Sequence, residues 1–426
     1  MARTTLIVLS ASALLLTAVH AQQNKALDGD GVVNIAATRN RDFLALNERV
    51  RETEALLRQA GVRPFPMIET EVATGRPLGT AGEEEYSAGY FQPIETGGKR
   101  QKRTSVASFG VELARAELAD RRRLLAIDVK LRYAEAVAAQ RKLETLRALL
   151  QIDRDNYDLT NARVRAGDAA PLEAALFSAE AGKTRAQQAT YSGRLASSLA
   201  ELRRIAGVPS SEPFEIRYEF TTLQSLPDLE SLKSQAKDRP DLRALRINER
   251  RIGAETELAI AEGKRDLTAS ARYSQRNSQF DAFGLTAGGA IVPLRDRDNI
   301  LTFGLSIPLF TGSRNRGNVE ASEARAAAAR QKSEFLEGTI PLEIESAWQR
   351  SVAARESVQL LKGVIDQSEA NIKVIREAYN LGQLRALDVL NEQRRLVDTR
   401  LSFVDAQLEA EQARIDLERA AGGPIR

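Results

Sequence analysis

Residue types that usually carry catalysis or hold soft metal ions are almost absent from this sequence. It contains no cysteine, and its single histidine, His20, lies inside a predicted N-terminal signal. A mature chain that has neither cysteine nor histidine has no thiolate site and no Cys–His or Ser–His nucleophile–base pair. The run Gly97-Gly98-Lys99 lacks the spacing of a phosphate-binding loop. We therefore expect no enzymatic activity, no cofactor and no resident metal site.

The polar residues of most interest lie in one chain turn, residues 379–390. Tyr379 and Arg385 could form hydrogen bonds there, although solvated positions are an equally good interpretation. Asp388 would suit the N-terminus of the following helix, where the helix dipole favours an acid. We expect Gly382 to end the preceding helix with a positive φ.

The turn has an earlier counterpart at residues 163–173. Its glycine, Gly167, lies 215 residues before Gly382 (382 − 167 = 215). The same offset relates further pairs, namely Pro93 to Pro308, Gly97 to Gly312, and Gly207 to Gly422. Three separate anchors with no insertion between them indicate a duplicated chain.

The composition favours long helices. Ala, Leu, Arg and Glu dominate the 426 residues, as in coiled coils. The mean hydropathy of −0.33 and an aromatic content of 5% argue against one large globular core. The 61 basic and 58 acidic residues nearly balance, so no nucleic-acid partner is expected.

The N-terminus has the pattern of a secretory signal over residues 1–21. A basic residue, Arg3, precedes the apolar run 6–19, and Val19-His20-Ala21 resembles a cleavage site. The run is too short to span a membrane, and the alternative is a buried N-terminal helix. No later stretch predicts a transmembrane helix.

Each half contains one predicted antiparallel hairpin. In residues 301–309, apolar side chains alternate strictly with Thr, Gly, Ser and Pro, which predicts a strand with one apolar and one polar face. Residues 267–276 alternate in the same way. We expect hairpins at about 67–94 and about 267–309, with 277–299 as a long loop. Strands of about 9–11 residues have the length that crosses a membrane at a tilt.

Long helices are predicted after each hairpin. The ranges are 98–165 and 313–380, followed by return helices at 171–206 and 386–421, with shorter upper helices at 32–61 and 240–263. An upper and a return helix placed end to end nearly match one long helix in length. A heptad of apolar residues along 386–421 predicts packing against neighbouring helices, and Arg394 and Glu411 interrupt it.

The predicted organisation is therefore two structural repeats and a connecting segment. The first repeat spans 22–206 and the second spans 240–422, with a short tail at 423–426. Prolines break the helical pattern over 207–239, which we expect to form an equatorial belt with a strand at 214–220 and a helix at 229–236.

Four strands cannot form a closed membrane sheet by themselves. Edge N–H and C=O groups would remain unpaired in lipid, and about eight strands are needed for the smallest filled barrel. Several chains must therefore share one barrel. Two copies would give eight strands and a filled interior, and three copies would give twelve strands and room for a lumen.

The sequence resembles the TolC-type outer-membrane efflux channel family over nearly all of the mature chain. The resemblance rests on the duplication, the turn residues Tyr379, Gly382 and Asp388-Val389-Leu390, the strand end Ile307-Pro308-Leu309-Phe310, and Arg239-Pro240-Asp241-Leu242. The run from Ile94 to Arg100, followed by Arg103, is similar to the heavy-metal, CzcC-type branch.

The resemblance implies a homotrimer, mainly α-helical, with a twelve-stranded β-barrel in the outer membrane continued by a twelve-helix periplasmic α-barrel. The implied partners are a periplasmic adaptor, an inner-membrane RND-type pump and outer-membrane lipid. The expected function is a passive exit duct of a tripartite efflux system, with metal ions and drugs both open as substrates. No lipidated cysteine follows the signal, so anchoring is expected to rest on the barrel alone.

The resemblance also implies roles for the turn residues. Asp388 corresponds to the aspartate that lines the family's periplasmic constriction, and Glu173 is its counterpart in the first half. Three copies of Asp388 would form an acidic ring that favours cations, and Tyr379 and Arg385 would brace the closed tip. Asn391 stands where relatives can carry a second acid, which argues against a strong double ring. Adaptor contact is expected at the tip turns, namely Gly167, Gly382, Leu384 and Leu387.

Two further expectations complete the interpretation. Pro93, Gly97, Pro308 and Gly312 are expected to mark the junctions between strand and helix. The alternative function, from a different class, is a soluble periplasmic coiled-coil scaffold or adaptor, which would have no need for strand pairs of membrane length.

Overall fold

The computed structural model describes residues 26–78, 83–221, 225–309 and 315–425. The predicted signal (1–21) and Gly312 lie outside these ranges. The chain divides into two units. We call them the hairpin unit (Met1–Glu48, Glu117–Leu242 and Leu336–Arg426) and the sheet unit (Arg49–Ala116 and Arg243–Phe335).

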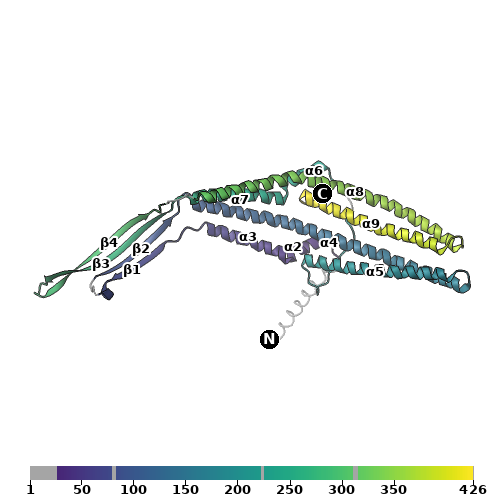
Figure 1. Cartoon of the computed structure of the whole chain (residues 1–426), viewed down its shortest axis with the longest axis horizontal. Coiled ribbons are helices and arrows are strands. Elements are labelled where there is room, and N and C mark those ends of the chain that lie inside the picture. The colour runs from purple at the N-terminus through teal and green to yellow at the C-terminus, as the bar shows by residue number, and fades with distance from the viewer. Residues whose placement is uncertain (1–25, 79–82, 222–224, 310–314, 426) are drawn as a thin grey trace, which may run out of the picture. The chain divides into compact units, whose positions relative to one another are not determined.

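The sheet unit contains a four-stranded antiparallel sheet in the order β1-β2-β3-β4 (Figure 1). The strands span Met67–Thr74, Glu84–Ile94, Leu267–Leu285 and Ile291–Ser306. A short helix η1 (Arg76–Leu78) lies between β1 and β2. The sheet has two open edges, because β1 and β4 each pair on one side only.

The second hairpin differs from the prediction. The expected loop at 277–299 is mostly strand, since β3 and β4 contain 19 and 16 residues and only the turn 286–290 separates them. This segment has polar residues on both faces, as in Arg295-Asp296-Arg297-Asp298. It therefore lacks the apolar–polar alternation by which a strand is recognised, although its backbone still pairs.

The strand register separates an apolar face from a polar face. Ile68, Tyr90, Ala271 and Phe303 form one cross-strand row on the apolar face. The adjacent row, on the polar face, is Glu69, Gly89, Arg272 and Thr302. The sheet thus has the two-sided character expected of a membrane strand.

Ion pairs tie the strands together on the polar face. The Arg272 guanidinium reaches across β2 and donates to Glu71 Oε2 at 3.0 Å. Gly89 allows this reach, because a Cβ at that position would lie 2.8 Å from the Phe91 ring and 3.6 Å from Arg272 Cβ. Arg276 similarly donates to Glu85 Oε2 at 2.9 Å.

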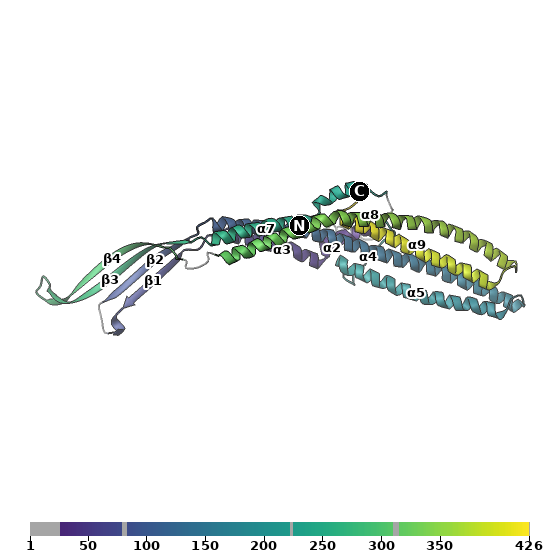
Figure 2. The ribbon, with the colours of Figure 1, turned by 45° about the horizontal axis from the view of Figure 1, so that its top comes forward.

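The helices have the following bounds. The N-terminal pair is α2 (Gly29–Arg39) and α3 (Arg41–Ala60), the long helices are α4 (Lys99–Ala166) and α8 (Arg316–Asn380), and the return helices are α5 (Pro171–Ala206) and α9 (Ala386–Ala421). The equatorial segment holds α6 (Leu229–Gln235) and η2 (Ala236–Asp238), and α7 spans Pro240–Glu262. Figure 2 shows the α4/α5 and α8/α9 hairpins of the hairpin unit from a second side. No helix among the described residues combines the length and apolar character needed to cross a membrane.

The expected single helix at 32–61 is wrong, because the chain breaks at Asn40. The Asn40 side chain caps α3 by accepting from the Phe43 N–H at 2.9 Å. Its amide also donates to the carbonyl of Ile205, at the end of α5, at 2.8 Å. Both bonds use the Asn40 side chain as a cap, which explains why the helix is interrupted there.

The expected strand at 214–220 is also wrong. The segment makes one isolated parallel bridge, between Leu27 and Ile216. Ile216 is 5% exposed and packs with Val32, Val129 and Leu202 in a core shared by α2, α4 and α5. Its apolar residues are therefore buried against helices rather than aligned along a sheet.

Candidate functional site

The candidate site is the pair of helical turns in the hairpin unit. Gly167 and Gly382 have φ values of 85° and 75°, and no atom lies within 4 Å of a Cβ built on either. Backbone conformation, not space, is therefore what favours glycine at both positions. In the second turn, Gly382 N–H donates to the carbonyl of Tyr379 and Gln383 N–H to that of Ala378.

Tyr379 joins three helices at these turns. It is 6% exposed, and its hydroxyl lies 3.2 Å from both Thr160 Oγ1 on α4 and Glu173 Oε2 on α5. The Arg163 guanidinium carbon lies 5.1 Å from the centre of its ring, within the range of a cation–π contact. The Phe177 ring packs edge-on against it, with the ring centres 6.4 Å apart. One side chain of α8 therefore links the α8/α9 hairpin to the α4/α5 hairpin.

Other polar contacts link the two hairpins farther along the helices from the turns. Arg394 of α9 forms an ion pair with Glu180 of α5, a carboxylate that is 7% exposed. The Arg394 guanidinium lowers the pKa of Glu180. Buried Asp153 of α4 accepts from Thr184 Oγ1 at 2.7 Å and from Gln393 Nε2 at 2.6 Å.

The pKa of Asp153 is raised at this position. Burial raises its pKa above the ordinary 3.8, and the hydrogen bonds from Thr184 and Gln393 only partly offset that effect. Burial also lowers the pKa of Arg376, whose Nε has no hydrogen-bond partner among the described residues. The layer formed by Asp153, Thr184, Glu180, Gln393 and Arg394 is called the polar layer below.

We predict opposite effects for two substitutions of Asp153. A raised pKa in the folded state means that stability falls as pH rises from 3.8 through the folded value. Asp153→Asn removes the buried charge. Its amide oxygen can still accept from Gln393 Nε2 and its NH2 group can donate to Thr184 Oγ1, so it should stabilise the protein at neutral pH. Asp153→Ala leaves Thr184 and Gln393 unpaired and should be less stable than Asp153→Asn by roughly 2 kcal/mol. Urea unfolding at pH 5 and pH 8 checks this, and equal midpoints for the two variants at pH 8 would contradict it.

Asp388 and Arg385 lie at the start of α9. The backbone N–H of Arg385 donates to Asp388 Oδ2 at 3.0 Å, so the Asp388 carboxylate caps the helix. Both side chains are exposed. The structure thus brings together Tyr379 and Glu173, and separately Arg385 and Asp388, but it gives no contact between Arg385 and Tyr379 among the described residues.

Apolar side chains are exposed around the same turns. Leu384 and Leu387 are 36% and 49% exposed, and Leu172 and Leu381 are more exposed still. Buried Ala386, Val389 and Leu390 lie beside them and form a core with Phe177 and Tyr379. The turns therefore present leucines on a well-packed base.

Sequence reasoning missed most of the residues that Tyr379 contacts and most of the polar layer. Thr160, Arg163 and Asp153 lie inside long helices with no distinguishing motif. Arg394 did carry a signal, because it interrupts the apolar heptad of α9, and a charge in a packed seam implies a buried partner.

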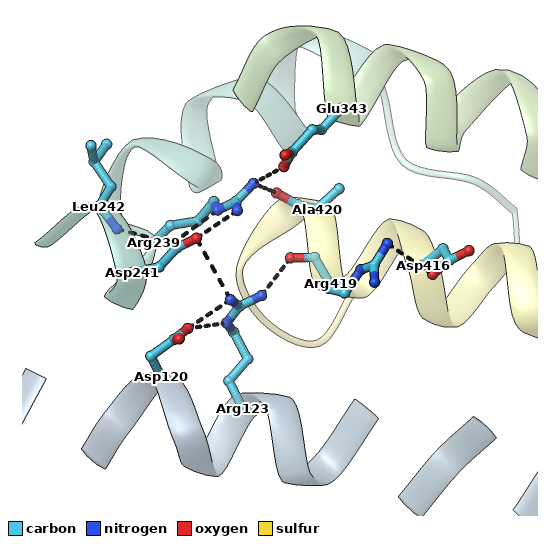
Figure 3. Close-up of polar contacts among 9 residues, drawn as sticks. All are labelled: Asp120, Arg123, Arg239, Asp241, Leu242, Glu343, Asp416, Arg419 and Ala420. Carbon is cyan, nitrogen blue, oxygen red and sulfur yellow. Dashed lines mark hydrogen bonds and ion pairs between the residues drawn. The ribbon is translucent and has the colours of Figure 1, made fainter. Parts of the chain in front are cut away.

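A second cluster of charges surrounds the end of α9 (Figure 3). Arg239 is 5% exposed and holds Asp241 with two hydrogen bonds, at 3.1 and 2.7 Å. Its Nη1 also donates to Glu343 at 2.6 Å and to the carbonyl of Ala420 at 3.1 Å. Arg123 donates to the carbonyl of Arg419 at 2.6 Å. Two guanidinium groups thus cap the C-terminus of one helix.

The same capping contact occurs in both halves of the hairpin unit. Asn40 caps the carbonyl of Ile205 near the end of α5, as Arg239 caps that of Ala420 near the end of α9. In each case a glycine lies two residues after the capped residue, namely Gly207 after Ile205 and Gly422 after Ala420. A Cβ on Gly207 would lie 2.6 Å from the Arg39 carbonyl oxygen, and one on Gly422 would lie 2.5 Å from Arg239 Cγ. The repeated Ala-Gly motif therefore provides room for the cap.

The predicted strand–helix junctions lie close to their expected places. Pro93 is the penultimate residue of β2, which differs from the expected position between the elements. Gly97 has a φ of 67° and precedes α4, and Pro308 follows the end of β4. Gly312 lies outside the described residues.

The chain belongs to the outer membrane efflux protein family. The sequence profile of that family matches residues 32–208 and 232–423. The expected family, its duct function and its outer-membrane location with a periplasmic extension are thereby confirmed, and the alternative of a soluble scaffold is wrong. The expectation of a transport protein rather than an enzyme is confirmed in the same way.

Three comparisons illustrate the relationship. The chain is 24% identical to the cobalt-zinc-cadmium resistance protein CzcC of Cupriavidus metallidurans, over 92% of this chain and 89% of that protein. It is 26% identical to the nickel-cobalt-cadmium resistance protein NccC of Alcaligenes xylosoxydans xylosoxydans, over 72% and 65%. The crystal structure of the outer membrane protein VceC from Vibrio cholerae has the same fold, with a TM-score of 0.73, 20% identity and coverage of 93% and 97%.

Proposed function

We propose that three copies of this chain form a passive duct that exports heavy-metal cations across the outer membrane. The observation that carries the proposal is the four-stranded sheet with one apolar face and two open edges. In lipid, both edges must pair, and neighbouring copies supply the missing partners. Three copies give a twelve-stranded barrel with room for a lumen.

The proposed substrate class rests on similarity to two metal-resistance proteins, CzcC and NccC. Selection of the ion would take place at an inner-membrane RND-type pump, because the described residues contain no group of three or more metal-binding side chains. The duct then acts by conduction. Exposed Leu384 and Leu387, with the glycine turns at Gly167 and Gly382, are the proposed contact for the tip of a periplasmic adaptor.

The substrate is tested in a strain that lacks the gene. The strain should lose tolerance to cobalt, zinc or cadmium, and the intact gene should restore it, whereas tolerance to drugs should change little. Loss of drug tolerance with unchanged metal tolerance would contradict the metal proposal and leave the duct intact. Native mass spectrometry of the purified protein should give the mass of three chains.

The proposed gate has two parts. Tyr379 with Glu173 and Thr160, together with the polar layer, holds the two hairpins against each other in the resting state. Asp388 supplies an acidic ring at the narrow end, and Arg385 positions it through the backbone cap. Engagement of the adaptor at the tips would release these links.

Substitutions of Asp388 separate its cap from its charge. Asp388→Asn keeps an oxygen that accepts from the Arg385 N–H and removes the three charges of the ring. It should weaken the block by divalent cations in a planar bilayer by at least several-fold and change stability little. Asp388→Ala should weaken the block equally and also cost about 1 kcal/mol for the lost cap. If Asp388→Asn is blocked like the wild type, Asp388 is a cap and not a gate residue.

A further inference from the structure

The outer end of β4 separates its charges between the two faces of the sheet. The sequence Arg295-Asp296-Arg297-Asp298 alternates in sign, and successive side chains of a strand point to opposite faces. Arg295 and Arg297 therefore share the face of Leu301 and Phe303. The two aspartates lie on the polar face, where Asp298 stands beside Arg276. This stretch of β4 thus places its two positive charges on the apolar side of the sheet.

Tyrosines mark where the apolar band ends on that side. The Tyr273 hydroxyl donates to Asn299 Oδ1 at 2.8 Å, and the Tyr86 hydroxyl donates to Glu84 Oε2 at 3.0 Å. Both hydroxyls point toward the turn end of the sheet, as expected of tyrosines whose rings face lipid and whose polar ends face headgroups. On the same face, Arg297 is paired with Asn277 in the row that follows Asn299 toward the turn. At about 3.3 Å per residue, Arg297 lies about 13 Å beyond Leu301, at headgroup depth.

Neither guanidinium group pairs with a carboxylate among the described side chains of this face. Glu84 shares a row with Asn277 and Arg297, and it is already paired with Arg76 at 2.6 Å. Arg297 Nε donates to the neutral Asn277 amide at 3.3 Å, and within the described residues no carboxylate pairs with Arg295 or Arg297. Both residues are exposed. Two positive charges are therefore available to a ligand that approaches from the lipid side.

The orientation of the sheet identifies which leaflet they meet. All four strands connect to helices at one end, and the turn 286–290 lies at the opposite end (Figure 1). Because the family places the helices in the periplasm, the turn end faces the exterior. The apolar band and the two arginines thus meet the outer leaflet.

We propose that Arg295 and Arg297 bind phosphate groups of outer-leaflet lipid and thereby fix the depth and rotation of the duct in the membrane. Guanidinium groups match phosphate oxygens in charge and geometry. The proposal rests on the outer-membrane location and not on the proposed gate or the proposed metal substrate. Its test is therefore independent of theirs.

The test measures lipid binding to the purified full-length protein in neutral detergent. The probe is diphosphorylated lipid A, compared with the same lipid after removal of its phosphates, and the readout is native mass spectrometry. The wild type should prefer the phosphorylated lipid. Arg295→Gln with Arg297→Gln should weaken binding about 10- to 30-fold. Arg295→Lys with Arg297→Lys keeps the charge but not the planar guanidinium geometry, so it should weaken binding less than the double Gln variant.

A control on the opposite face excludes an effect of net charge. Asp296→Asn with Asp298→Asn removes two negative charges, which raises the net charge by two, and leaves the lipid-facing residues unchanged, so it should bind like the wild type. The proposal is overturned if the double Gln variant binds like the wild type, if the Asn control binds much more tightly, or if millimolar inorganic phosphate displaces the lipid. The double Gln variant should conduct normally in bilayers, which shows that the barrel has formed.

Discussion

The double variant Tyr379→Phe/Arg394→Gln is expected to raise the time-averaged conductance of the purified protein in a planar bilayer several-fold. Tyr379→Phe keeps the ring against Phe177 and Arg163 and removes the hydroxyl that lies 3.2 Å from Thr160 and Glu173. Arg394→Gln removes the ion pair with Glu180. Together these changes remove contacts worth about 2–3 kcal/mol to the closed arrangement, which shifts a two-state equilibrium about 30- to 160-fold.

A matched control lies on the same helix. Arg400 pairs with Glu369 of α8, so this ion pair lies within one hairpin and does not link the two hairpins. Arg400→Gln should leave the conductance unchanged. Equal conductance for the double variant and the wild type would show that the links around Tyr379 and Arg394 do not hold a gate.

The largest loss of stability is expected for Arg239→Met. The substitution removes the hydrogen bonds from Arg239 to Asp241 and to the carbonyl of Ala420, and leaves the Arg123 guanidinium, at 3.8 Å, as the only cationic group paired with Asp241 among the described residues. Breaking a buried pair from one side costs about 3–5 kcal/mol. Trp348 is the only tryptophan and packs in the same core as Leu417 and Ala421. Its indole N–H donates to the Pro227 carbonyl at 3.3 Å. Tryptophan fluorescence during urea unfolding therefore reports directly on the packing around Arg239 at the end of α9.

The matched control for this prediction is Arg419→Met. The Arg419 side chain is 53% exposed and pairs only within its own helix, with Asp416, among the described residues. Its loss should change the unfolding free energy by less than about 0.5 kcal/mol. Similar unfolding midpoints for Arg239→Met and Arg419→Met would contradict the assigned role of Arg239.

The Arg239–Asp241 pair also predicts how the stability of the protein depends on pH. Burial raises the pKa of Asp241, but the hydrogen bonds and charge of Arg239 outweigh burial, and the net pKa lies below the ordinary 3.8. A lowered folded pKa gives stability that is present above 3.8 and is lost as pH falls through the folded value. Arg239→Met should therefore flatten the loss of stability in acid. An unchanged acid limb in the Trp348 signal would show that Asp241 does not contribute to it.

The fold could be inferred from the sequence where periodicity was strong. The ends of α5 and α9 follow from Pro171, Gly207 and Gly422, which are local signals. The polar continuation of β3 and β4 could not be inferred, because Arg295-Asp296-Arg297-Asp298 is polar on both faces and only backbone pairing makes it a strand. Asn40 was missed for a related reason, since its role depends on Ile205, 165 residues away.

The candidate site was only partly accessible from the sequence. Tyr379, Glu173 and Asp388 could be selected because they lie at recognisable turns. The partners of Tyr379 on α4, Thr160 and Arg163, are set by how the hairpins pack, and packing partners on long regular helices leave no local motif. Only one residue of the polar layer gave a signal in the sequence, namely Arg394, whose charge interrupts the apolar heptad of α9.

Single-channel recording of the wild-type protein in a planar bilayer tests the duct most directly. We expect discrete conductance steps and, in a salt gradient, a reversal potential with the sign of cation preference, because Asp388 would line the narrow end in three copies. Protein that is incorporated into the bilayer and gives no steps would contradict it.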